Sequence, residues 1–486
     1  MSGTVVDNSS KENIAFATVQ IGESHGVVTN QEGDFSINIS NFFENDSLVF
    51  SSMGYERKSI SLKDYEGGVV YLQENLNELK EVVLVDKNLT GKEIMLRVNQ
   101  NRYQNYDSSL AGFTVFHRSE NKNTPGKVAF RIKKADFIDR TNLREFNKSI
   151  DSIAKSAKGV TSSFYDAYLA EVVRNEKGHF KTRIKKATEL VNEEKSNSME
   201  VLLSDVAEQV GKKLRTSNTF KVRTGIIPVG DSIDLSESFK EPNDSLKTNY
   251  VQGQISHVLK DSLFDARGGM TIAIGGGSET GLVFDYVTNV DDYEYTVDDL
   301  TSFNGDLVYR ISFKPDSGFF GGGGKYTGKI FVSADSYAVL KTEYRLAKGE
   351  HGAKFNLKFL LGVKFVENER KGMIIFEKKE DGKYAPKYVQ SSGKSYAYAK
   401  RSFVLKENGK SRSERMKLKF DFTMEFDTAY NSEFLLIDSK SISAKDYSEF
   451  KGNKGVLVEK TTTYNPQDWK EYNVLAPTEA IRTYEF

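Results

Sequence analysis

The sequence contains no cysteine, and this excludes thiol catalysis, disulfide bonds and cysteine-ligated metal sites. It has only one tryptophan and seven prolines among 486 residues. No run of eighteen apolar residues occurs, so the sequence predicts no transmembrane helix. Lysine plus arginine and aspartate plus glutamate number 68 each, and this balance gives no reason to expect nucleic acid or an anionic membrane surface as a partner.

Motifs for cofactor binding and nucleophilic catalysis are incomplete. Gly324-Lys325 follows a run of glycines, but Tyr326 stands where a phosphate-binding loop needs serine or threonine. Around Ser278 the nucleophile motif G-x-S-x-G fails, because Thr280 stands where its second glycine belongs. The acidic pairs at 291–292 and 298–299 lack the other positions of a calcium loop. We therefore expect no cofactor.

The histidines give no metal site. None of the five lies at the spacing of an H-x-x-x-H zinc helix. His117 and Glu120 have the H-x-x-E spacing of zinc carboxypeptidases, but FTVFHRSE reads as a strand, in which these two side chains point to opposite faces. We interpret them as a strand histidine and a solvated glutamate, and we predict no catalytic residue and no metal ligand.

Aromatic residues are abundant, and they predict a mainly β fold. The 24 tyrosines and 32 phenylalanines suit half-buried pleated surfaces. Residues 1–86 contain short, evenly spaced strand signals, which are typical of a small β-sandwich, and Gly33 is expected to take a positive φ in the turn after Asn30. Thr90 and Glu93 have capping-box spacing and predict a connector helix within 87–107.

The rest of the chain, residues 108–486, is predicted to form one large domain. Long alternating strands indicate an antiparallel curved sheet or an open half-barrel. Apolar residues at helical spacing interrupt these strands and predict helical inserts near 144–158, 196–214 and 241–266.

The clearest strand is MKLKFDFTMEF, in which apolar and polar residues alternate. Its apolar face is about 35 Å long, since a strand rises about 3.4 Å per residue. We single out this face as a site for an apolar ligand or a partner; its residues are Met416, Leu418, Phe420, Phe422, Met424 and Phe426. Two interpretations stay open: the face packs as ordinary core against a helix containing Met199, Leu202 and Val206, or part of it lines a cavity.

The first 85 residues resemble the carboxypeptidase-like regulatory domain. The segments that carry the resemblance are SGTVVDN, AFATVQI, GVVTNQEGDFSI, DSLVFSSMGY and LNELKEVVL. The resemblance implies a seven-stranded, transthyretin-like sandwich that is not a peptidase. Such domains are common in envelope proteins of Bacteroidota-type bacteria, often before TonB-dependent transporters. Asn30 departs from the family, which usually has aspartate there.

Later segments are similar to poorly characterised periplasmic or outer-membrane proteins with the same first domain. These segments are TGKEIMLRVNQN, AGFTVFHRS, YEYTVDDLTSFNGDLVYRISFKP, YTGKIFVSADSYAVLKTEY and DWKEYNVLAPTEAI. Together the resemblances imply an exported protein of the periplasm or outer membrane, with its signal peptide upstream of this sequence.

We therefore expect a non-enzymatic envelope protein that binds another envelope protein or an outer-membrane complex, for example as an accessory subunit in transport or secretion. Two alternatives stay open. One is a carrier of an apolar ligand in a half-barrel cavity. The other is a hydrolase of glycans or peptides whose carboxylates the sequence does not reveal.

Overall fold

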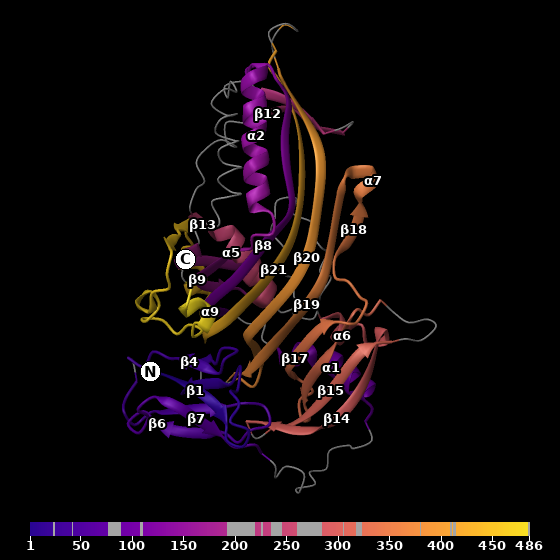
Figure 1. Cartoon of the computed structure of the whole chain (residues 1–486). Helices are drawn as coiled ribbons and strands as arrows, with labels where there is room; N and C mark the ends of the chain where they lie inside the picture. Colours follow the sequence, from indigo (N-terminus) through magenta and orange to yellow (C-terminus); the bar gives the residue numbers. More distant parts are fainter. Residues whose placement is uncertain are drawn as a thin grey trace.

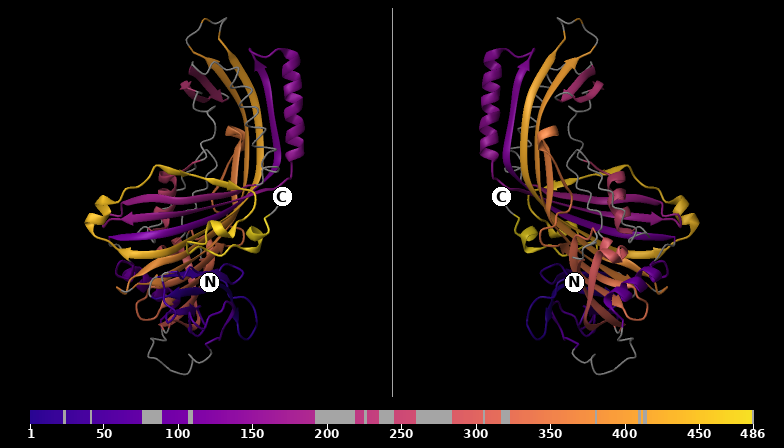
Figure 2. Two further views of the ribbon diagram at one scale, coloured as in Figure 1. Left: turned by 90° about the vertical axis from the view of Figure 1, so that its left-hand side faces the viewer. Right: turned by 90° about the vertical axis from the view of Figure 1, so that its right-hand side faces the viewer.

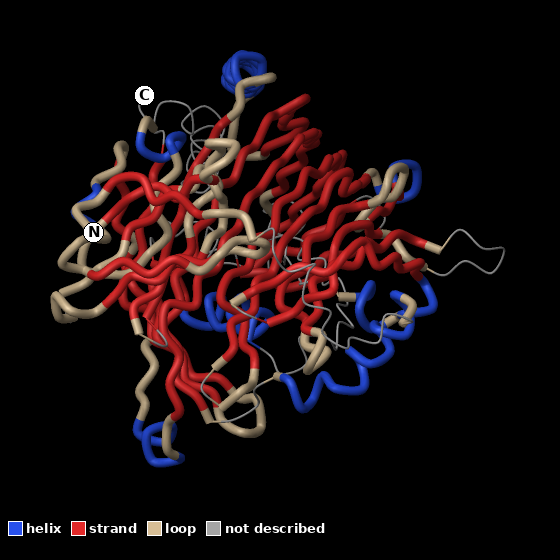
Figure 3. The backbone as a smooth tube through the Cα atoms, turned by 90° about the horizontal axis from the view of Figure 1, so that it is seen from below, coloured by secondary structure: helices blue, strands red, loops and turns tan. Residues whose placement is uncertain are grey.

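The computed structural model consists mainly of strands, with a few helices around them (Figure 3). The structure describes residues 1–22, 25–40, 42–75, 89–106, 110–191, 219–224, 227–234, 245–259, 284–304, 306–316, 323–379, 381–408, 411 and 415–484. The predicted helix near 196–214 and the glycine cluster at 275–277 lie outside these residues.

Seven short strands form the N-terminal sandwich (indigo in Figure 1). One sheet has the order β4-β1-β7, with Asp34–Ser36, Ser2–Asp7 and Gly68–Leu72. The other has the order β3-β2-β5-β6, with His25–Val28, Thr18–Ile21, Ser47–Ser51 and Lys58–Ser61. Alternate residues such as Val5, Val19 and Phe50 point inward and are fully buried. Gly33 has a φ of 76°, as the turn requires.

Eleven strands of the large sheet follow one path. Their order is β14-β15-β16-β17-β19-β20-β21-β8-β9-β10-β23, and all neighbours are antiparallel except β10 and β23. The mainly β fold with a large curved antiparallel sheet is therefore confirmed. The bounds in that order are Tyr293–Phe303, Asp306–Pro315, Tyr326–Ser333, Val339–Leu346, Val363–Lys378, Tyr384–Glu407, Lys417–Ser441, Ala111–Ala135, Ser162–Arg174, Phe180–Val191 and Glu459–Thr461.

Three of these strands, β8, β20 and β21, extend far beyond the body and form a curved blade (Figures 1 and 2). The strand β11 (Thr219–Thr224) pairs with the upper part of β20, and β12 (Ile227–Asp234) pairs with β11. On the other side of the blade lies helix α2 (Arg140–Ala157), capped at its start by Asp139.

Helix α2 covers the edge of β8 that has no strand partner in the blade. The side chain of Asn147 accepts from the backbone nitrogen of Ile132 and donates to its carbonyl, both at 2.9 Å, as a neighbouring strand would. An uncovered strand edge would invite pairing with another chain, and α2 removes that hazard.

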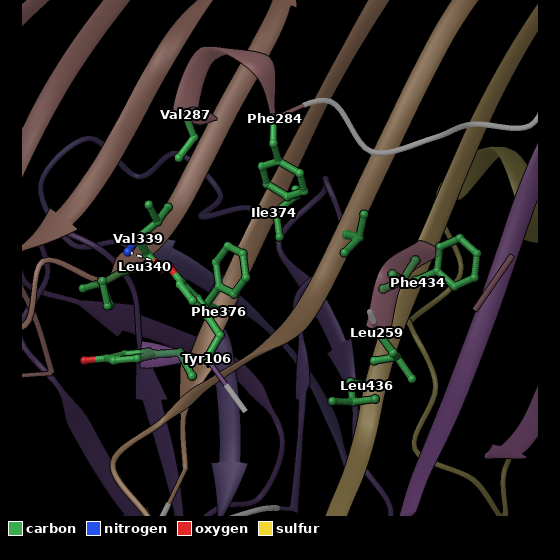
Figure 4. Packing of buried hydrophobic residues seen from close by; sticks show 14 of the residues in the cluster. Tyr106, Leu259, Phe284, Val287, Val339, Leu340, Ile374, Phe376, Phe434 and Leu436 are labelled. Atoms are coloured by element: carbon green, nitrogen blue, oxygen red, sulfur yellow. Dashed lines mark hydrogen bonds between the residues drawn. The ribbon is translucent and has the colours of Figure 1, made fainter. Parts of the chain in front are cut away.

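Helices cover one face of the lower sheet. Helix α1 (Gly91–Asn105) has a capping box between Thr90 and Glu93, and α6 (Asp285–Thr288) lies beside it. Helix α5 (Thr248–Leu259) belongs to the same core but packs on β10 and β20. Figure 4 shows residues of this core from several strands. Tyr106 both accepts from the nitrogen of Val339 and donates to its carbonyl, at 2.8 and 3.1 Å.

The sandwich packs against the opposite face of the same strands. Along β21, Phe434 and Leu436 belong to the helix-side core, whereas Leu435 and Ile437 belong to the sandwich-side core. This is the two-residue alternation of a strand that is covered on both faces. At the contact, Phe16 of the sandwich stacks on Tyr388 of β20, with ring centroids 5.3 Å apart.

Residues 464–484, here called the C-terminal strap, join the sandwich to the sheet. Its Trp469 packs edge-on against Phe116 of β8 at 5.2 Å. The Asn473 side chain accepts from the backbone nitrogen of Asn38 at 2.6 Å. Arg482 makes ion pairs with Glu32 at 3.1 Å and Asp34 at 3.0 Å, both in the sandwich turn.

A buried charged pair lies beneath the strap. Arg118 of β8 donates to Glu433 of β21 at 2.7 and 3.0 Å, and Tyr388 donates to the same carboxylate at 2.8 Å. Arg118 also donates to the carbonyl of Ala476 in the strap at 2.9 Å. Because both charges are buried, removal of one would leave the other without compensation. The pair therefore holds the strap on the sheet.

The contacts of Asn30 explain why asparagine stands here instead of the aspartate that is usual in the family. It is fully buried, and its side-chain oxygen accepts from the backbone nitrogens of Glu32 and Asp34, both at 2.9 Å. Its side-chain nitrogen donates to the strap carbonyl of Pro477 at 3.2 Å. An aspartate could replace the first two contacts but would turn the third into a repulsion between oxygens.

The substitution Asn30→Asp should lower the free energy of unfolding by about 1–3 kcal/mol, because it leaves a buried carbonyl without its donor. Urea denaturation of the full chain measures this. Gln31→Glu is the matched control, since it adds the same charge at the exposed neighbouring position. Equal stability of both variants would contradict the role assigned to Asn30. That residues 1–86 fold as a separate domain stays a prediction.

Candidate functional site

The six residues of the predicted apolar face lie on one side of β21, on the same side as the helix-covered core. The structure divides them into two groups. Met416 and Leu418 are buried, and Phe420 packs against their cluster together with Ile150 of α2. The remaining three, Phe422, Met424 and Phe426, are half-buried. At the upper end of the face, Met416 and Leu418 therefore pack as core beside α2. The helix containing Met199, Leu202 and Val206, which the core interpretation named as the partner, lies outside the described residues.

Apolar residues of the neighbouring strands lie next to this half-buried group on the same face of the sheet. Met424 is in register with Ala399 of β20 and Val128 of β8, and Ala399 is in turn opposite Val363 of β19. The edge strand β18 (Lys354–Leu357) adds two more residues on this face. We call this surface the apolar strip: Val128, Phe130, Phe355, Leu357, Val363, Phe365, Ala397, Ala399, Phe422, Met424 and Phe426.

The two faces of the blade differ sharply in polarity. On the face opposite the apolar strip, Asp421 forms an ion pair with Lys133 and accepts from Ser402 at 2.6 Å. Tyr396 donates to Glu425 at 3.0 Å on that same face. On the strip itself, Arg401 is in register with Phe422 and adds one positive charge to a surface that is otherwise apolar. The strip is therefore an apolar surface with one positive charge.

A second group of polar side chains surrounds His117, which the sequence predicts to be an ordinary strand histidine. Its Nε2 lies 3.0 Å from the hydroxyl of Ser432, and its Nδ1 lies 3.9 Å from a carboxylate oxygen of Asp166. Serine, histidine and aspartate in this order are the groups of a hydrolase triad. Glu120, the other member of the H-x-x-E pattern, instead accepts from Tyr165 at 2.6 Å.

The surroundings of His117 do not support catalysis. The ring is 2% exposed and lies against Tyr168 and Phe434, with centroids 4.7 and 4.3 Å away. Burial, with the nearby Arg118 charge, lowers the pKa of His117 to about 3, so the ring is a poor general base. Ser432 is also buried, and its backbone belongs to the ladder between β20 and β21. A substrate carbonyl has no room beside its hydroxyl.

Asp166 is the acidic residue of this cluster. It is half-buried and accepts from Ser119 at 2.6 Å and from Asn121 at 3.3 Å. Burial raises the pKa of Asp166 to about 6, although these hydrogen bonds act in the opposite direction. The distance of 3.9 Å to His117 is too long for the hydrogen bond that orients a catalytic histidine.

Within the described part of the chain, no group of three histidine or carboxylate side chains converges as a metal site would. The acidic pairs at 291–292 and 298–299 are engaged with basic or hydroxyl groups instead. Asp291 pairs with Lys92 at 2.7 Å, and Asp298 accepts from Ser312 at 2.7 Å. Of the described helices, none combines the length and apolar character that crossing a membrane requires.

A small cavity of ≈ 40 Å³ lies under the C-terminal strap, lined among others by Arg118, Asp166 and Trp469. This volume suits one or two water molecules rather than a lipid or a sugar. A second cavity, of ≈ 10 Å³, lies beside Phe434 and Leu259. Neither of these two cavities is lined by residues of the apolar strip.

Sequence reasoning found β21 but missed its neighbours on the strip, because register between distant strands leaves no local signal. It also missed the contact of His117 with Ser432, which are separated by 315 positions. The apolar residues of β18 and β19 did alternate in KFNL and VKF, and this alternation was the available signal.

Comparison with known proteins supports the assignment of the first domain. Residues 1–84 match the CarboxypepD_reg-like domain family, which is a regulatory and non-catalytic domain. The match covers none of the large sheet. No curated protein matches the chain.

Two solved structures show distant likeness. One is MucB in complex with MucA(peri), at 7% identity and a TM-score of 0.16, with 69% of this chain and 93% of that chain covered. The other is a putative membrane-associated protein of unknown function from Bacteroides fragilis NCTC 9343, at 9% identity and a TM-score of 0.12, with 89% and 97% covered. At these TM-scores neither likeness carries an argument.

The low pKa of His117 predicts a pH-dependent stability. The unfolded histidine binds a proton below about pH 6.5, whereas the folded one stays neutral down to about pH 3, so stability is lost as the pH falls between these values. We expect the wild type to lose about 2 kcal/mol more than His117→Gln when the pH is lowered from 7 to 5. Denaturation at both pH values measures this, and equal losses would contradict the burial of a neutral ring.

Ser432 should not react as a nucleophile. Because its hydroxyl is buried and His117 is a poor base, a fluorophosphonate probe should leave the folded protein unlabelled, as read by intact-protein mass spectrometry. A single adduct that disappears in Ser432→Ala and in His117→Gln would reveal a working triad and overturn this account.

Proposed function

We propose that the protein is a non-enzymatic binding protein of the cell envelope whose apolar strip takes an apolar segment of a partner protein. The observation that carries the proposal is the half-buried state of Phe422, Met424 and Phe426, next to the fully buried Leu418 on the same strand face. A contiguous apolar surface with a polar surround is typical of an interaction site.

The energy available at the strip is considerable. Full burial of a phenylalanine or methionine side chain contributes about 1.5–3 kcal/mol relative to exposure. Since the three residues are already half-buried, a partner would gain part of this amount from each. Arg401 would favour a partner segment that carries a carboxylate beside its apolar side chains.

A partner segment fits this surface better than an enclosed lipid. A carrier needs a concave pocket that buries most of its ligand. The strip is instead an open sheet face, and the two small cavities described above lie elsewhere. An extended sheet face of this kind matches an extended or helical segment of another protein.

The first domain supports a location in the envelope. The domain it resembles is common in envelope proteins of Bacteroidota-type bacteria, and is itself non-catalytic. On this basis we place the protein in the periplasm or at the outer membrane, as an accessory subunit of a transport or secretion complex.

The strip should bind a hydrophobic fluorescent probe. The double variant Met424→Thr/Phe426→Thr removes apolar area but introduces β-branched side chains suited to a strand, so it should lose most probe binding while remaining folded. Fluorescence titration and urea denaturation measure the two effects.

The control is Leu418→Ala on the buried part of the same face. It should lower the free energy of unfolding by about 2–5 kcal/mol, because it opens a cavity in the core, and should leave probe binding by the folded protein unchanged. Probe binding that survives in the double variant would rule out the strip as the binding surface.

A further inference from the structure

A short hairpin at the edge of the large sheet carries the most exposed aromatic side chain that the structure describes. Strand β18 leads through helix α7 (Lys358–Leu361) into β19, and Phe359 of α7 is fully exposed, at 105%. The preceding Leu357 is 41% exposed. In Figure 1 this hairpin stands at the margin of the sheet, away from the sandwich and the helix-covered core.

The hairpin is ordered, so Phe359 is held outward by its fold. Gly362 ends α7 with a φ of 64°, and its carbonyl accepts from the backbone nitrogen of Lys400 at 2.7 Å. A side chain at Gly362 would lie 2.2 Å from the carbonyl of Lys400, so only glycine fits. Phe355 and Phe365 stack across the hairpin, with centroids 5.9 Å apart.

Lysines flank Phe359 on both sides in the sequence. No acidic residue occurs between Glu350 and Glu367, a stretch that contains three lysines. Two of them lie over aromatic rings of β20: Lys358 is 4.4 Å from the ring of Tyr398, and Lys364 is 5.2 Å from that of Tyr396. Two further basic residues of β20, Lys400 and Arg401, follow Tyr398 and Ala399 in the sequence.

The tip of this hairpin carries no acidic residue, whereas its base does contact one. No ion pair is found for Lys354, Lys358 or Lys364 among the residues that the structure describes. By strand register Glu425 and Asp427 of β21 lie two strands from Lys364, with about 10 Å between the backbones. Tyr396, whose ring lies under Lys364, donates to Glu425 at 3.0 Å. Glu367 lies at the base of the hairpin, where its carboxylate accepts from the backbone nitrogen of Ala353 at 3.0 Å and pairs with Arg370 at 2.7 Å. The hairpin therefore carries a local excess of positive charge, although the charges of the whole chain balance.

We propose that this hairpin is a membrane-attachment site that inserts Phe359 and Leu357 into the interface of an anionic lipid surface. An exposed apolar tip flanked by lysines is the arrangement that interfacial binding requires. The apolar side chains enter the acyl boundary, and the lysine stems extend so that their ammonium groups meet lipid phosphates. The charge complementarity selects an anionic bilayer as the occupant. Leu357 lies at the margin of the apolar strip, but the proposal depends on Phe359 and the neighbouring lysines and needs no partner on the rest of the strip.

Sedimentation of the full chain with lipid vesicles tests this. The wild type should sediment with vesicles of phosphatidylglycerol and phosphatidylcholine, and much less with phosphatidylcholine alone. Phe359→Ser should weaken the partition by about tenfold or more, since it removes a large apolar group from the interface. Phe43→Ser is the matched control, because Phe43 is 80% exposed but lies in the sandwich, and it should bind as the wild type does.

Charge and depth have separate tests. Each of Lys354→Gln, Lys358→Gln and Lys364→Gln should weaken binding to the anionic vesicles by roughly fivefold. In Phe359→Trp the fluorescence of the new indole should shift to the blue when anionic vesicles are added, while the buried Trp469 of the wild type gives no shift.

Three outcomes would overturn the proposal: a wild type that does not sediment with anionic vesicles, equal binding by Phe359→Ser, or no shift in Phe359→Trp. A change of oligomeric state in Phe359→Ser without loss of vesicle binding would assign the hairpin to a protein interface instead. Met424→Thr/Phe426→Thr should bind vesicles normally, so failure of this site and failure of the apolar strip can be told apart.

Discussion

Three strands of 24 or 25 residues, β8, β20 and β21, are hydrogen-bonded to one another along most of their length, and both halves of the molecule depend on this ladder. In the lower half, the alternation of side chains supplies two cores, one under the helices and one under the sandwich. In the upper half, the same alternation separates an apolar face from a polar one. A shift of register by one residue would exchange the two faces everywhere, so the functional surface and the core are fixed together.

Local patterns predicted much of this architecture. The alternation in MKLKFDFTMEF, the capping box at Thr90 and the positive φ of Gly33 each depend on neighbouring residues, and each is present in the structure. The position of the sandwich on the sheet could not be predicted in this way. It depends on contacts such as Asn30 with Pro477, which are 447 positions apart and involve a backbone carbonyl that has no sequence signature.

The candidate site was predictable only in part, because local patterns reveal a strand face but not what covers it. Strand alternation identified six residues on one face, but their division into core and exposed surface depends on where α2 and β11 end. Phe359 was not singled out, because the short apolar run KFLL reads equally well as a buried segment. His117 and Ser432 show the converse: their proximity suggests a triad, and only their burial decides against it.

The central claim, that one strand face passes from core to exposed binding surface within β21, can be measured directly because the chain has no cysteine of its own. Single variants Leu418→Cys and Met424→Cys would each carry one thiol, and the rate of maleimide labelling under native conditions reports its exposure. The account predicts that Met424→Cys reacts much faster than Leu418→Cys, and that a hydrophobic probe slows only Met424→Cys. Equal rates at the two positions, or a faster reaction at Leu418→Cys, would contradict it.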